Sequence, residues 1–400
     1  MDDQGPMTAT VIGAGPAGLM AAEVLSAGGV QVTVMDRMPS VGRKFLMAGK
    51  SGLNLTKVED PATFAAAYGD APPALRQALA DVSAQRVIDW AAGLGQPIFT
   101  GSTGRVFPEA MKASPLLRAW LTRLDRQGVT VRTRWRWTGW DGDASVFDTP
   151  DGPRTVQADV TILAMGGASW RRLGSDGAWA NRIGDVAPFA PANCGFLVSW
   201  SDYMTPFFGT PVKATLLRAG TVTSRGEWVI SRTGIEGGGV YAVSAAVRDG
   251  APLTVDLLPD LAESVVARRL STLPDRISLS QALKKAFRLP PVKIALYQEM
   301  IRKMPQSDGR HVASFLKALP IAHGGPTPLD DAISTAGGLR FAALDGFILK
   351  DRPGVFAAGE MLDWEAPTGG YLLTGCLATG HAAGRQALTF AQSRRHRDPA

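Results

Sequence analysis

A glycine-rich turn near the start of the chain has the residue types and the spacing that bind a dinucleotide phosphate. A short apolar run precedes Gly13-x-Gly15-x-x-Gly18, and Pro16 and Ala17 open a helix of small residues. Gly13 permits a tight turn, Gly15 leaves the backbone open to a pyrophosphate, and Gly18 lets the helix pack close to a sheet. The N-terminus of that helix presents free N–H groups and a positive dipole end to the phosphates.

A carboxylate follows this turn at the distance where recognition of a ribose is expected. A second apolar run ends at Asp36, which lies 18 residues after Gly18. An acidic side chain there can accept hydrogen bonds from an adenosine ribose. A lone Gly-x-Gly-x-x-Gly is a weak signal, but here both strands, the helix and the acidic residue are in place. The alternative is a glycine-rich turn in another kind of α/β protein.

A second set of candidate residues lies far down the chain. The heptapeptide GVFAAGE predicts an apolar strand that ends in Gly359-Glu360, and Gly369-Gly370-Tyr371 opens another small-residue helix. This spacing resembles the two-dinucleotide-binding-domain flavoproteins, which place such an acidic residue near the ribityl and pyrophosphate of FAD. They also point the following helix at the flavin pyrimidine. FAD is longer than NAD and needs this second contact set, whereas a plain buried strand is the alternative for GVFAAGE.

Two further segments agree with an FAD site. The segment DVTILAMGG predicts a buried strand, and it resembles the segment by which such proteins return to FAD, through Ala164, Gly166 and Gly167. In residues 128–140 tryptophans alternate with arginines, and this period of two predicts one strand. Trp137 best matches the position that packs against adenine in related flavoproteins, and packing within a sheet is the alternative. The arginines form either a solvated charged face or a nucleic-acid contact.

The segment that follows Asp36 points to a family. It reads RMPSVGRKFLMAGKSGLNLT. With the C-terminal segments, it resembles the BaiN/YhiN-type FAD-dependent flavoproteins, whose pattern is G-R-K-hydrophobic-x-x-S-G-x-G-R-C-N-x-T. Gly52 and Leu53 replace the Arg-Cys pair of that pattern, which suggests a divergent branch and argues against a cysteine-dependent role at this loop. The residues of the segment that the resemblance assigns to the cofactor are Arg37, Gly42, Arg43, Lys44, Ser51, Asn54 and Thr56.

The loop over residues 42–56 also has a composition suited to anionic ligands. It is rich in glycine, serine, threonine and asparagine and carries three cations. These residues supply hydrogen-bond donors for phosphate and flavin oxygens. Arg43 and Lys44 either neutralise the pyrophosphate or border the substrate, and an ordinary charged surface loop is the alternative.

Length and composition fit a cytosolic globular enzyme. The chain has 400 residues, 45% of them apolar, and a net charge of +6 from 42 basic and 36 acidic residues. This charge is mild and does not by itself indicate nucleic acid. Cys194 and Cys376 form no C-x-x-C pair and the four histidines share no metal-ligand spacing, so neither a disulfide framework nor a metal site is expected. No stretch is long and apolar enough to span a bilayer and the N-terminus lacks an apolar signal core, so we expect a cytoplasmic protein without a membrane anchor.

The pattern of elements predicts an α/β fold, a Rossmann-like two-dinucleotide-binding-domain FAD fold with an inserted β-barrel domain that carries a helical subdomain. Short alternating runs predict strands in the insert, and helical periodicity replaces them after residue 260. The expected boundaries are 1–190 and 331–400 for the discontinuous FAD-binding domain, 191–259 and 320–330 for the β-rich insert, and 260–319 for the helical subdomain.

These features together predict an FAD-dependent oxidoreductase that performs two-electron or hydride transfer on an unidentified small molecule. FAD is expected to bind non-covalently. NAD(P)H, if it is the donor, visits the flavin transiently, because no second nucleotide fingerprint is present. No catalytic acid or base can be assigned, since Tyr371, His323 and Lys44 are candidates by chemistry only. The alternative is a flavin-containing RNA-binding, RNA-modifying or sensing protein, with nucleic acid the less favoured partner.

Overall fold

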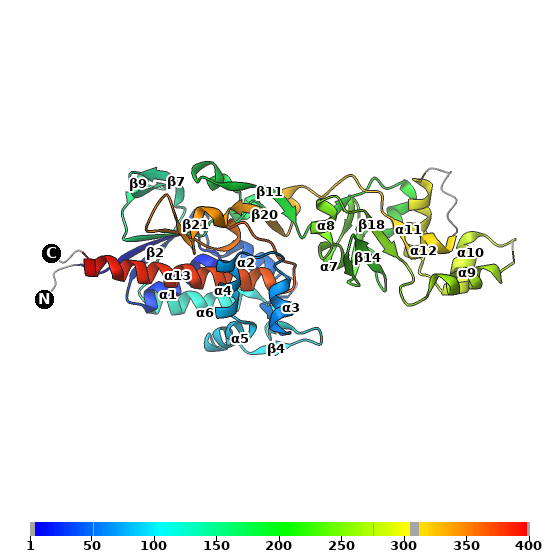
Figure 1. Cartoon of the computed structure of the whole chain (residues 1–400), viewed down its shortest axis with the longest axis horizontal. Helices are drawn as coiled ribbons and strands as arrows, with labels where there is room; N and C mark the ends of the chain where they lie inside the picture. The colour runs from blue at the N-terminus through cyan, green and yellow to red at the C-terminus, as the bar shows by residue number, and fades with distance from the viewer. Residues whose placement is uncertain (1–4, 51, 275, 305–311, 398–400) are drawn as a thin grey trace. The chain divides into compact units, whose positions relative to one another are not determined.

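The computed structural model divides the chain into two compact units, each with a hydrophobic core of its own. Unit 1 comprises residues 1–190 and 334–400, and unit 2 comprises residues 191–333. The colours of Figure 1 separate them, because unit 2 runs from green to yellow while unit 1 holds both the blue and the red ends of the chain. The residues that the structure describes are 5–50, 52–274, 276–304 and 312–397.

A seven-stranded sheet forms the centre of unit 1. Its strand order is β21-β22-β23-β10-β1-β2-β6, in which β23, β10, β1, β2 and β6 run parallel. β1 pairs with β10 on one side and with β2 on the other, so the carboxyl ends of these three strands meet at one edge, where such sheets bind ligands. The strands are β1 Thr8–Ile12, β2 Gln31–Asp36, β6 Thr130–Thr133, β10 Val160–Leu163, β21 Leu344–Asp345, β22 Ile348–Leu349 and β23 Val355–Ala357.

Two helices from opposite ends of the chain, α1 (Pro16–Ala27) and α13 (Tyr371–Arg397), pack against one another in unit 1 (Figure 1). Small residues let their backbones approach closely. A Cβ at Gly380 would lie 2.2 Å from the carbonyl oxygen of Ala17, and a Cβ at Gly384 would lie 3.1 Å from Cα of Ala21. The last helix of the chain therefore covers the first.

A buried polar contact joins α1 to helices α5 and α6. The carboxylate of Glu23 accepts hydrogen bonds from Nε1 of Trp90 at 3.2 Å, Nε1 of Trp120 at 2.6 Å and the guanidinium of Arg123 at 2.7 Å. Because a buried carboxylate is stable only when its charge and lone pairs are satisfied, these three donors fix the helices around it. The remaining α-helices of unit 1 are α2 Arg43–Ala48, α3 Pro61–Ala66, α4 Pro73–Asp81, α5 Ala84–Gly93 and α6 Ala113–Arg126.

Three small sheets complete unit 1, with the strand orders β3-β5-β4, β7-β8-β9 and β11-β20. β3 contacts the long C-terminal helix α13, and residues of β7 line the cavity described below. Their bounds are β3 Thr56–Lys57, β4 Ile98–Thr100, β5 Arg105–Pro108, β7 Arg136–Asp141, β8 Ala144–Thr149, β9 Gly152–Val156, β11 Val186–Ala192 and β20 Ser334–Leu339. Short 3₁₀ helices are η1 Arg171–Leu173, η2 Ala178–Arg182, η5 Phe341–Ala343 and η6 Gly359–Met361.

The prediction of one strand over residues 128–140 is wrong. β6 ends before Arg134, which takes a left-handed conformation with φ of 62°, and β7 then starts in another sheet. Two backbone bonds stabilise this break, from the N–H of Arg134 to Met38 O at 3.1 Å and from the N–H of Trp135 to Asp36 O at 2.9 Å. The alternation of tryptophan and arginine is therefore divided between a parallel sheet and an antiparallel sheet.

Unit 2 contains two four-stranded antiparallel sheets, with the orders β12-β17-β16-β13 and β15-β14-β18-β19, and helices follow β18 along the chain. Closure of these sheets into a barrel and a separate helical subdomain stay predictions. The strands are β12 Phe196–Leu197, β13 Pro211–Val212, β14 Leu216–Ala219, β15 Val222–Ser224, β16 Trp228–Ser231, β17 Gly234–Glu236, β18 Leu253–Asp256 and β19 Leu319–Pro320. The helices are α7 Gly238–Tyr241, α8 Ser244–Arg248, α9 Glu263–Ser271, α10 Leu279–Phe287, α11 Pro291–Arg302 and α12 Val312–Lys317, with η3 Asp202–Phe207 and η4 Leu329–Asp331.

Among the helices of the described residues, none combines the length and the apolar character that crossing a bilayer requires.

Candidate dinucleotide cofactor site

A cavity opens in unit 1 at the carboxyl ends of β1, β2 and β10. Residues from the first 50 positions and from the last third of the chain both line it, so the separated sequence motifs meet in one place. The predicted site residues that line it are Gly13, Gly15, Pro16, Ala17, Asp36, Arg37, Gly42, Arg43, Lys44, Trp137, Ala164, Gly166, Gly359 and Glu360.

Other predicted site residues lie outside this lining. Gly18 is inside α1, and a Cβ there would lie 1.9 Å from the carbonyl oxygen of Gly13. A Cβ at Gly167 would lie 2.6 Å from Oγ1 of Thr335. Both glycines therefore allow close packing within the protein. Ser51 falls outside the described residues.

Asn54 and Thr56, also predicted for the site, belong to the junction between β3 and the start of α13 and do not line the cavity. Nδ2 of Asn54 donates to the carbonyl oxygens of Thr56 at 2.9 Å and Val106 at 3.1 Å. Oγ1 of Thr56 accepts a hydrogen bond from Oγ1 of Thr374 at 2.9 Å. The structure thus gives these two residues partners within the protein.

The Gly369-Gly370-Tyr371 segment reaches the same junction and also lies outside the cavity lining. A Cβ at Gly370 would lie 2.5 Å from the carbonyl carbon of Thr56, while one at Gly369 would lie 3.4 Å from Nε of Arg105. The φ values of the two glycines, 103° and 109°, also disfavour any other residue. The close approach of backbones is therefore sufficient to explain Gly370, and the left-handed backbone conformation is sufficient to explain Gly369.

The Tyr371 hydroxyl lies between two charged side chains. It donates to the Glu59 carboxylate and accepts a hydrogen bond from Nζ of Lys57 at 3.1 Å. Burial, followed by the bond to Glu59, raises the pKa of Tyr371, so its hydroxyl is protonated at neutral pH. His323, the candidate in unit 2, has its ring 5.0 Å from that of Phe196, and burial lowers its pKa. Neither residue lines the cofactor cavity.

Glycine is needed for different structural reasons at the first two glycine positions of the N-terminal turn. Gly13 has φ of 105°, and a Cβ there would lie 2.2 Å from the carbonyl oxygen of Ala164. A Cβ at Gly15, in contrast, would meet no protein atom within 4 Å although Gly15 lines the cavity. Protein packing therefore does not require glycine at position 15, and the open space above its backbone fits a bound phosphate.

Asp36 closes the glycine turn onto the end of β2. One carboxylate oxygen accepts a hydrogen bond from the N–H of Ala14 at 2.8 Å, and the other accepts one from the N–H of Met38 at 2.8 Å. Burial raises the pKa of Asp36, and these two backbone bonds oppose the increase. A carboxylate can accept about four hydrogen bonds, so lone pairs are left for a ribose hydroxyl.

Three buried polar atoms without a partner among the described residues belong to side chains that line this cavity: Nε of Arg43, Nε1 of Trp137 and Oγ of Ser175. Buried polar atoms are nearly always paired, so such a group of unpaired atoms indicates a ligand with hydrogen-bond acceptors. The phosphates and the adenosine of FAD have acceptors of this kind. The residues present therefore fit the cofactor that the sequence predicts.

Ser175, in the segment GSDG over residues 174–177, was not among the predicted site residues. Its hydroxyl is close to the loop after β10, because a Cβ at Gly166 would lie 3.0 Å from its oxygen.

The charge of the cavity also fits a pyrophosphate. Five cationic and three acidic side chains line it, which leaves an excess of two positive charges. Arg37 pairs with Asp176, and Lys44 pairs with Glu360 at 2.6 Å. Arg43 makes no ion pair within the described ranges, and its guanidinium has only a 3.3 Å hydrogen bond to Ser40. Arg182 also lines the cavity without an ion pair in the described ranges, but it is exposed, whereas Nε of Arg43 is buried without a partner. Arg43 is therefore the lining cation that we expect to meet a phosphate.

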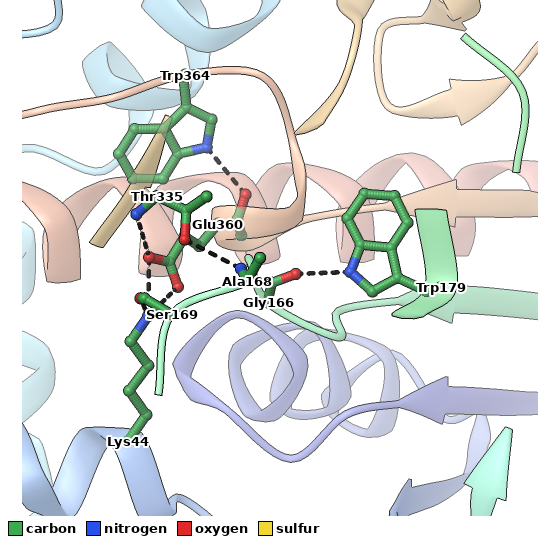
Figure 2. A network of polar contacts seen from close by, with 9 residues as sticks. Lys44, Gly166, Ala168, Ser169, Trp179, Thr335, Glu360 and Trp364 are labelled. Atoms are coloured by element: carbon green, nitrogen blue, oxygen red, sulfur yellow. Dashed lines mark hydrogen bonds and ion pairs between the residues drawn. The ribbon is translucent and has the colours of Figure 1, made fainter. Parts of the chain in front are cut away.

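Figure 2 shows how Lys44 and Glu360 are held. Nζ of Lys44 donates to both carboxylate oxygens of Glu360, at 2.6 and 2.9 Å, and to Oγ of Ser169 at 2.8 Å. Glu360 also accepts a hydrogen bond from the N–H of Thr335 at 3.1 Å, and Oγ1 of Thr335 accepts one from the N–H of Ala168 at 3.0 Å. The network joins α2, the loop after β10, the start of β20 and the 3₁₀ helix η6 that follows β23.

Two indoles fix the backbone beside this network (Figure 2). Nε1 of Trp179 donates to the carbonyl oxygen of Gly166 at 2.8 Å, and Nε1 of Trp364 donates to that of Gly359 at 2.9 Å. Both carbonyls belong to glycines that line the cavity. The contacts hold the cavity wall without filling the cavity.

Cys376 also lines the cavity. The sequence did not predict this, because Cys376 is the sixth residue of helix α13. Burial raises the pKa of its thiol to about 12. The thiol is therefore protonated at neutral pH and is a poor nucleophile. Cys194 is buried in unit 2, and neither cysteine forms a disulfide. No group of three or more histidine, cysteine, aspartate or glutamate side chains in the described part of the chain is placed to hold a metal ion.

Two curated relatives match over most of their length. The chain is 28% identical to a 3-dehydro-bile acid Δ(4,6)-reductase of Clostridium scindens, over 94% of this chain and 98% of the relative. It is 23% identical to a ribosomal RNA dihydrouridine synthase of Escherichia coli, over 91% of this chain and 93% of the relative.

Solved structures share the fold. A 3-ketosteroid-Δ4-(5α)-dehydrogenase of Rhodococcus jostii, solved with 4-androstene-3,17-dione, matches 98% of this chain and 98% of its own with a TM-score of 0.50 and 17% identity. A quinol fumarate reductase chain of E. coli matches 97% of this chain and 71% of its own with a TM-score of 0.51 and 15% identity.

The family model described as the HI0933-like protein Rossmann domain matches residues 7–386. The predicted fold class, a Rossmann-type FAD-binding fold, is confirmed by this match and by the parallel sheet of unit 1. The resemblance to the BaiN/YhiN-type flavoproteins is confirmed as well, because the chain belongs to the HI0933-like family.

Proposed function

We propose that this protein uses non-covalent FAD to add a hydride and a proton across a carbon–carbon double bond that is conjugated to a carbonyl group in a small molecule. The protein is a flavin-dependent oxidoreductase; the type of bond and the class of substrate are our proposals. The observation that supports the cofactor is the cavity with unpaired donors and two excess positive charges, which fits a dinucleotide.

The reaction type follows from what the two named relatives have in common. A Δ(4,6)-reductase and a dihydrouridine synthase both saturate a carbon–carbon double bond, and in each substrate a carbonyl is conjugated with that bond. Hydride addition to such a bond places negative charge on the carbonyl oxygen, so an enzyme must supply a reducing cofactor, a proton and a site that holds the substrate still. Bound FAD supplies the two-electron chemistry.

We assign the following roles to side chains of the cavity. The backbone at Gly15 and the N-terminus of α1 face the phosphates, and Arg43 contributes an unpaired positive charge. Asp36 accepts from a ribose hydroxyl. Trp137 and Ser175 donate to acceptors on the adenosine half of the cofactor. These residues bind and orient FAD, and none of them is assigned a proton transfer.

Reduced nicotinamide nucleotide is the donor that we propose for the reductive half-reaction. No second Gly-x-Gly-x-x-Gly turn is present in the sequence, so the donor would approach the flavin without a Rossmann domain of its own. A transient encounter of this kind predicts that the reduction rate depends on the donor concentration without a stable complex.

The test uses the purified holoprotein under anaerobic conditions. Acid release should yield FAD rather than FMN, and NADH or NADPH should bleach the oxidised flavin spectrum. A steroid with a 3-keto group conjugated to ring double bonds should then reoxidise the flavin, with a product that has gained two hydrogens. An unconjugated alkene of the same skeleton is the matched control and should leave the flavin reduced.

A ribosomal RNA fragment serves as a separate arm of this experiment, because two relatives carry that activity in their names. The structure gives no continuous arginine face to favour it, since Arg136 pairs with Asp148 and the guanidinium of Arg132 lies 5.3 Å from the Trp135 ring. Dihydrouridine formed in RNA, with no turnover of any conjugated ketone, would contradict the proposal. A protein without FAD would contradict its cofactor assignment.

A further inference from the structure

Lys44 and Glu360, two oppositely charged side chains of the cofactor cavity, form hydrogen bonds with one another and with neighbouring protein groups. Lys44 has three N–H donors, and all three have acceptors, on Glu360 and Ser169. The Lys44 side chain is 27% exposed and that of Glu360 is 13% exposed, so solvent screens this pair only in part. Lys44 therefore has no free donor, and its neighbour Arg43 is the unpaired cation of the same helix.

The charges of this pair act electrostatically on any ligand bound in the cavity. Both residues line the cavity that contains Gly15 and Asp36. A charge acts over several ångströms where the surroundings are partly dry, and the two members of a pair act with opposite signs. A cation favours a bound pyrophosphate and the added electrons of a reduced flavin, whereas a carboxylate disfavours both.

Resting on the proposed FAD cofactor, we propose that Lys44 and Glu360 form a charge-compensated pair that sets the affinity and the reduction potential of the bound flavin. Glu360 lowers the reduction potential of the flavin and Lys44 raises it. Lys44 also favours binding of the cofactor, so the pair sets cofactor affinity and reducing power together. Both act as positioning residues, since they work through charge and through the loop that they fix.

The anchoring of Glu360 explains why it is suited to this role. The N–H of Thr335 donates to its carboxylate at 3.1 Å, so the negative charge keeps one backbone partner when Lys44 is removed. Lys44, in contrast, loses its counter-charge when Glu360 is neutralised, although the hydroxyl of Ser169 still accepts from it. Removing either charge therefore changes the net charge of the cavity by one unit, and removing both leaves that net charge as it was.

A set of three variants tests the proposal by potentiometric titration and by FAD binding to the apoprotein. Glu360→Gln should raise the flavin midpoint potential and retain FAD at least as tightly as the wild type. Lys44→Met should lower the midpoint and weaken FAD binding about tenfold. The double variant should return both quantities toward the wild-type values, because it restores the wild-type net charge of the cavity.

Two controls separate charge from packing. Ser169→Ala removes a hydrogen bond to Lys44 without changing charge, so its midpoint should differ from the wild type far less than that of either charged variant. Glu227→Gln neutralises one member of an exposed 2.8 Å pair with Lys213 in unit 2 and should leave both measurements unchanged.

The signs of the two midpoint shifts decide the outcome. Shifts of the same sign in Lys44→Met and Glu360→Gln, or an unchanged midpoint in Glu360→Gln, would overturn the proposal. If Lys44→Met does not fold, Glu360→Gln and the double variant still give the sign and the compensation. A wild-type protein that binds no FAD contradicts the proposed function itself, whereas FAD binding without these shifts contradicts this inference alone.

Discussion

The backbone of Thr56 lies so close to Gly370 that a Cβ at position 370 would be 2.5 Å from its carbonyl carbon. Helix α13 therefore starts against strand β3 with no space for a side chain. The sequence resemblance suggested a different explanation for glycine at position 370, which is that a flavin ring approaches the N-terminus of this helix. Packing within unit 1 is enough to require it, so a substitution here tests folding before it tests redox chemistry.

Glycine substitutions should divide into two classes. Gly15→Val should abolish FAD retention while the apoprotein folds, since Gly15 lines the cavity and a Cβ there meets no protein atom within 4 Å. Gly18→Val and Gly370→Val should destabilise the apoprotein by about 1–3 kcal/mol or more, because their Cβ atoms would overlap backbone atoms. Denaturant unfolding and released-flavin analysis measure the two effects. A folded Gly15→Val protein with full FAD content would refute the phosphate assignment.

Trp137 should bind the cofactor through its indole N–H as well as through its ring. Nε1 of Trp137 is buried without a partner in the part of the chain that the structure describes, so Trp137→Phe should weaken FAD binding about five- to tenfold. Fluorescence titration of the apoprotein with FAD measures this loss. Trp120→Phe is the matched control, because its indole donates to Glu23 at 2.6 Å and its loss should lower stability rather than FAD affinity. Equal FAD affinity in Trp137→Phe and the wild type would exclude the hydrogen bond.

The cysteines should have no redox function. Burial raises the pKa of the Cys376 thiol to about 12, so it carries no thiolate at neutral pH, and Cys194 belongs to the other unit. The variant with alanine at both positions should keep its flavin spectrum and its reduction by NAD(P)H. Retained flavin with a loss of turnover would show that a thiol takes part.

His381 should give the folded state a specific sensitivity to acid. Burial and, after it, the charges of Arg86 and Arg385 lower the pKa of His381 from 6.5 to about 4. The unfolded chain therefore takes up a proton that the folded chain refuses, so this contribution to stability is complete above pH 6.5 and is lost as the pH falls toward 4. The difference in unfolding free energy between wild type and His381→Gln should change across this window. A difference that is constant with pH would count against the lowered pKa.

Local signals in the sequence predicted much of the Rossmann core. The helix expected over residues 16–27 forms over those residues, because Pro16 suits the first helical position and glycines follow its end. The strand before Gly359 forms as β23 over Val355–Ala357. These elements are set by short-range preferences and by apolar runs, which can be recognised without knowing what they pack against.

Features that depend on distant partners were not predictable in this way. The expected strand breaks at Arg134, where the carbonyl of Met38 accepts from the N–H of Arg134 and that of Asp36 accepts from the N–H of Trp135. These residues come close only when β6 pairs with β2. The pairing of Lys44 with Glu360 joins residues 316 positions apart. The sequence identified both as site residues, but their chemical types alone did not indicate that the two side chains would form an ion pair with one another.

The order of synthesis gives the discontinuity of unit 1 a further meaning. When a ribosome has made the first 190 residues, α1 has no α13 to cover it, β10 lacks its neighbour β23, and the cavity lacks Glu360. All of unit 2 is translated before these partners emerge. The nascent chain therefore carries an incomplete nucleotide pocket, and a face of α1 without its partner helix, until residues 355–397 have been made. A chain truncated before Val355 cannot complete its central sheet.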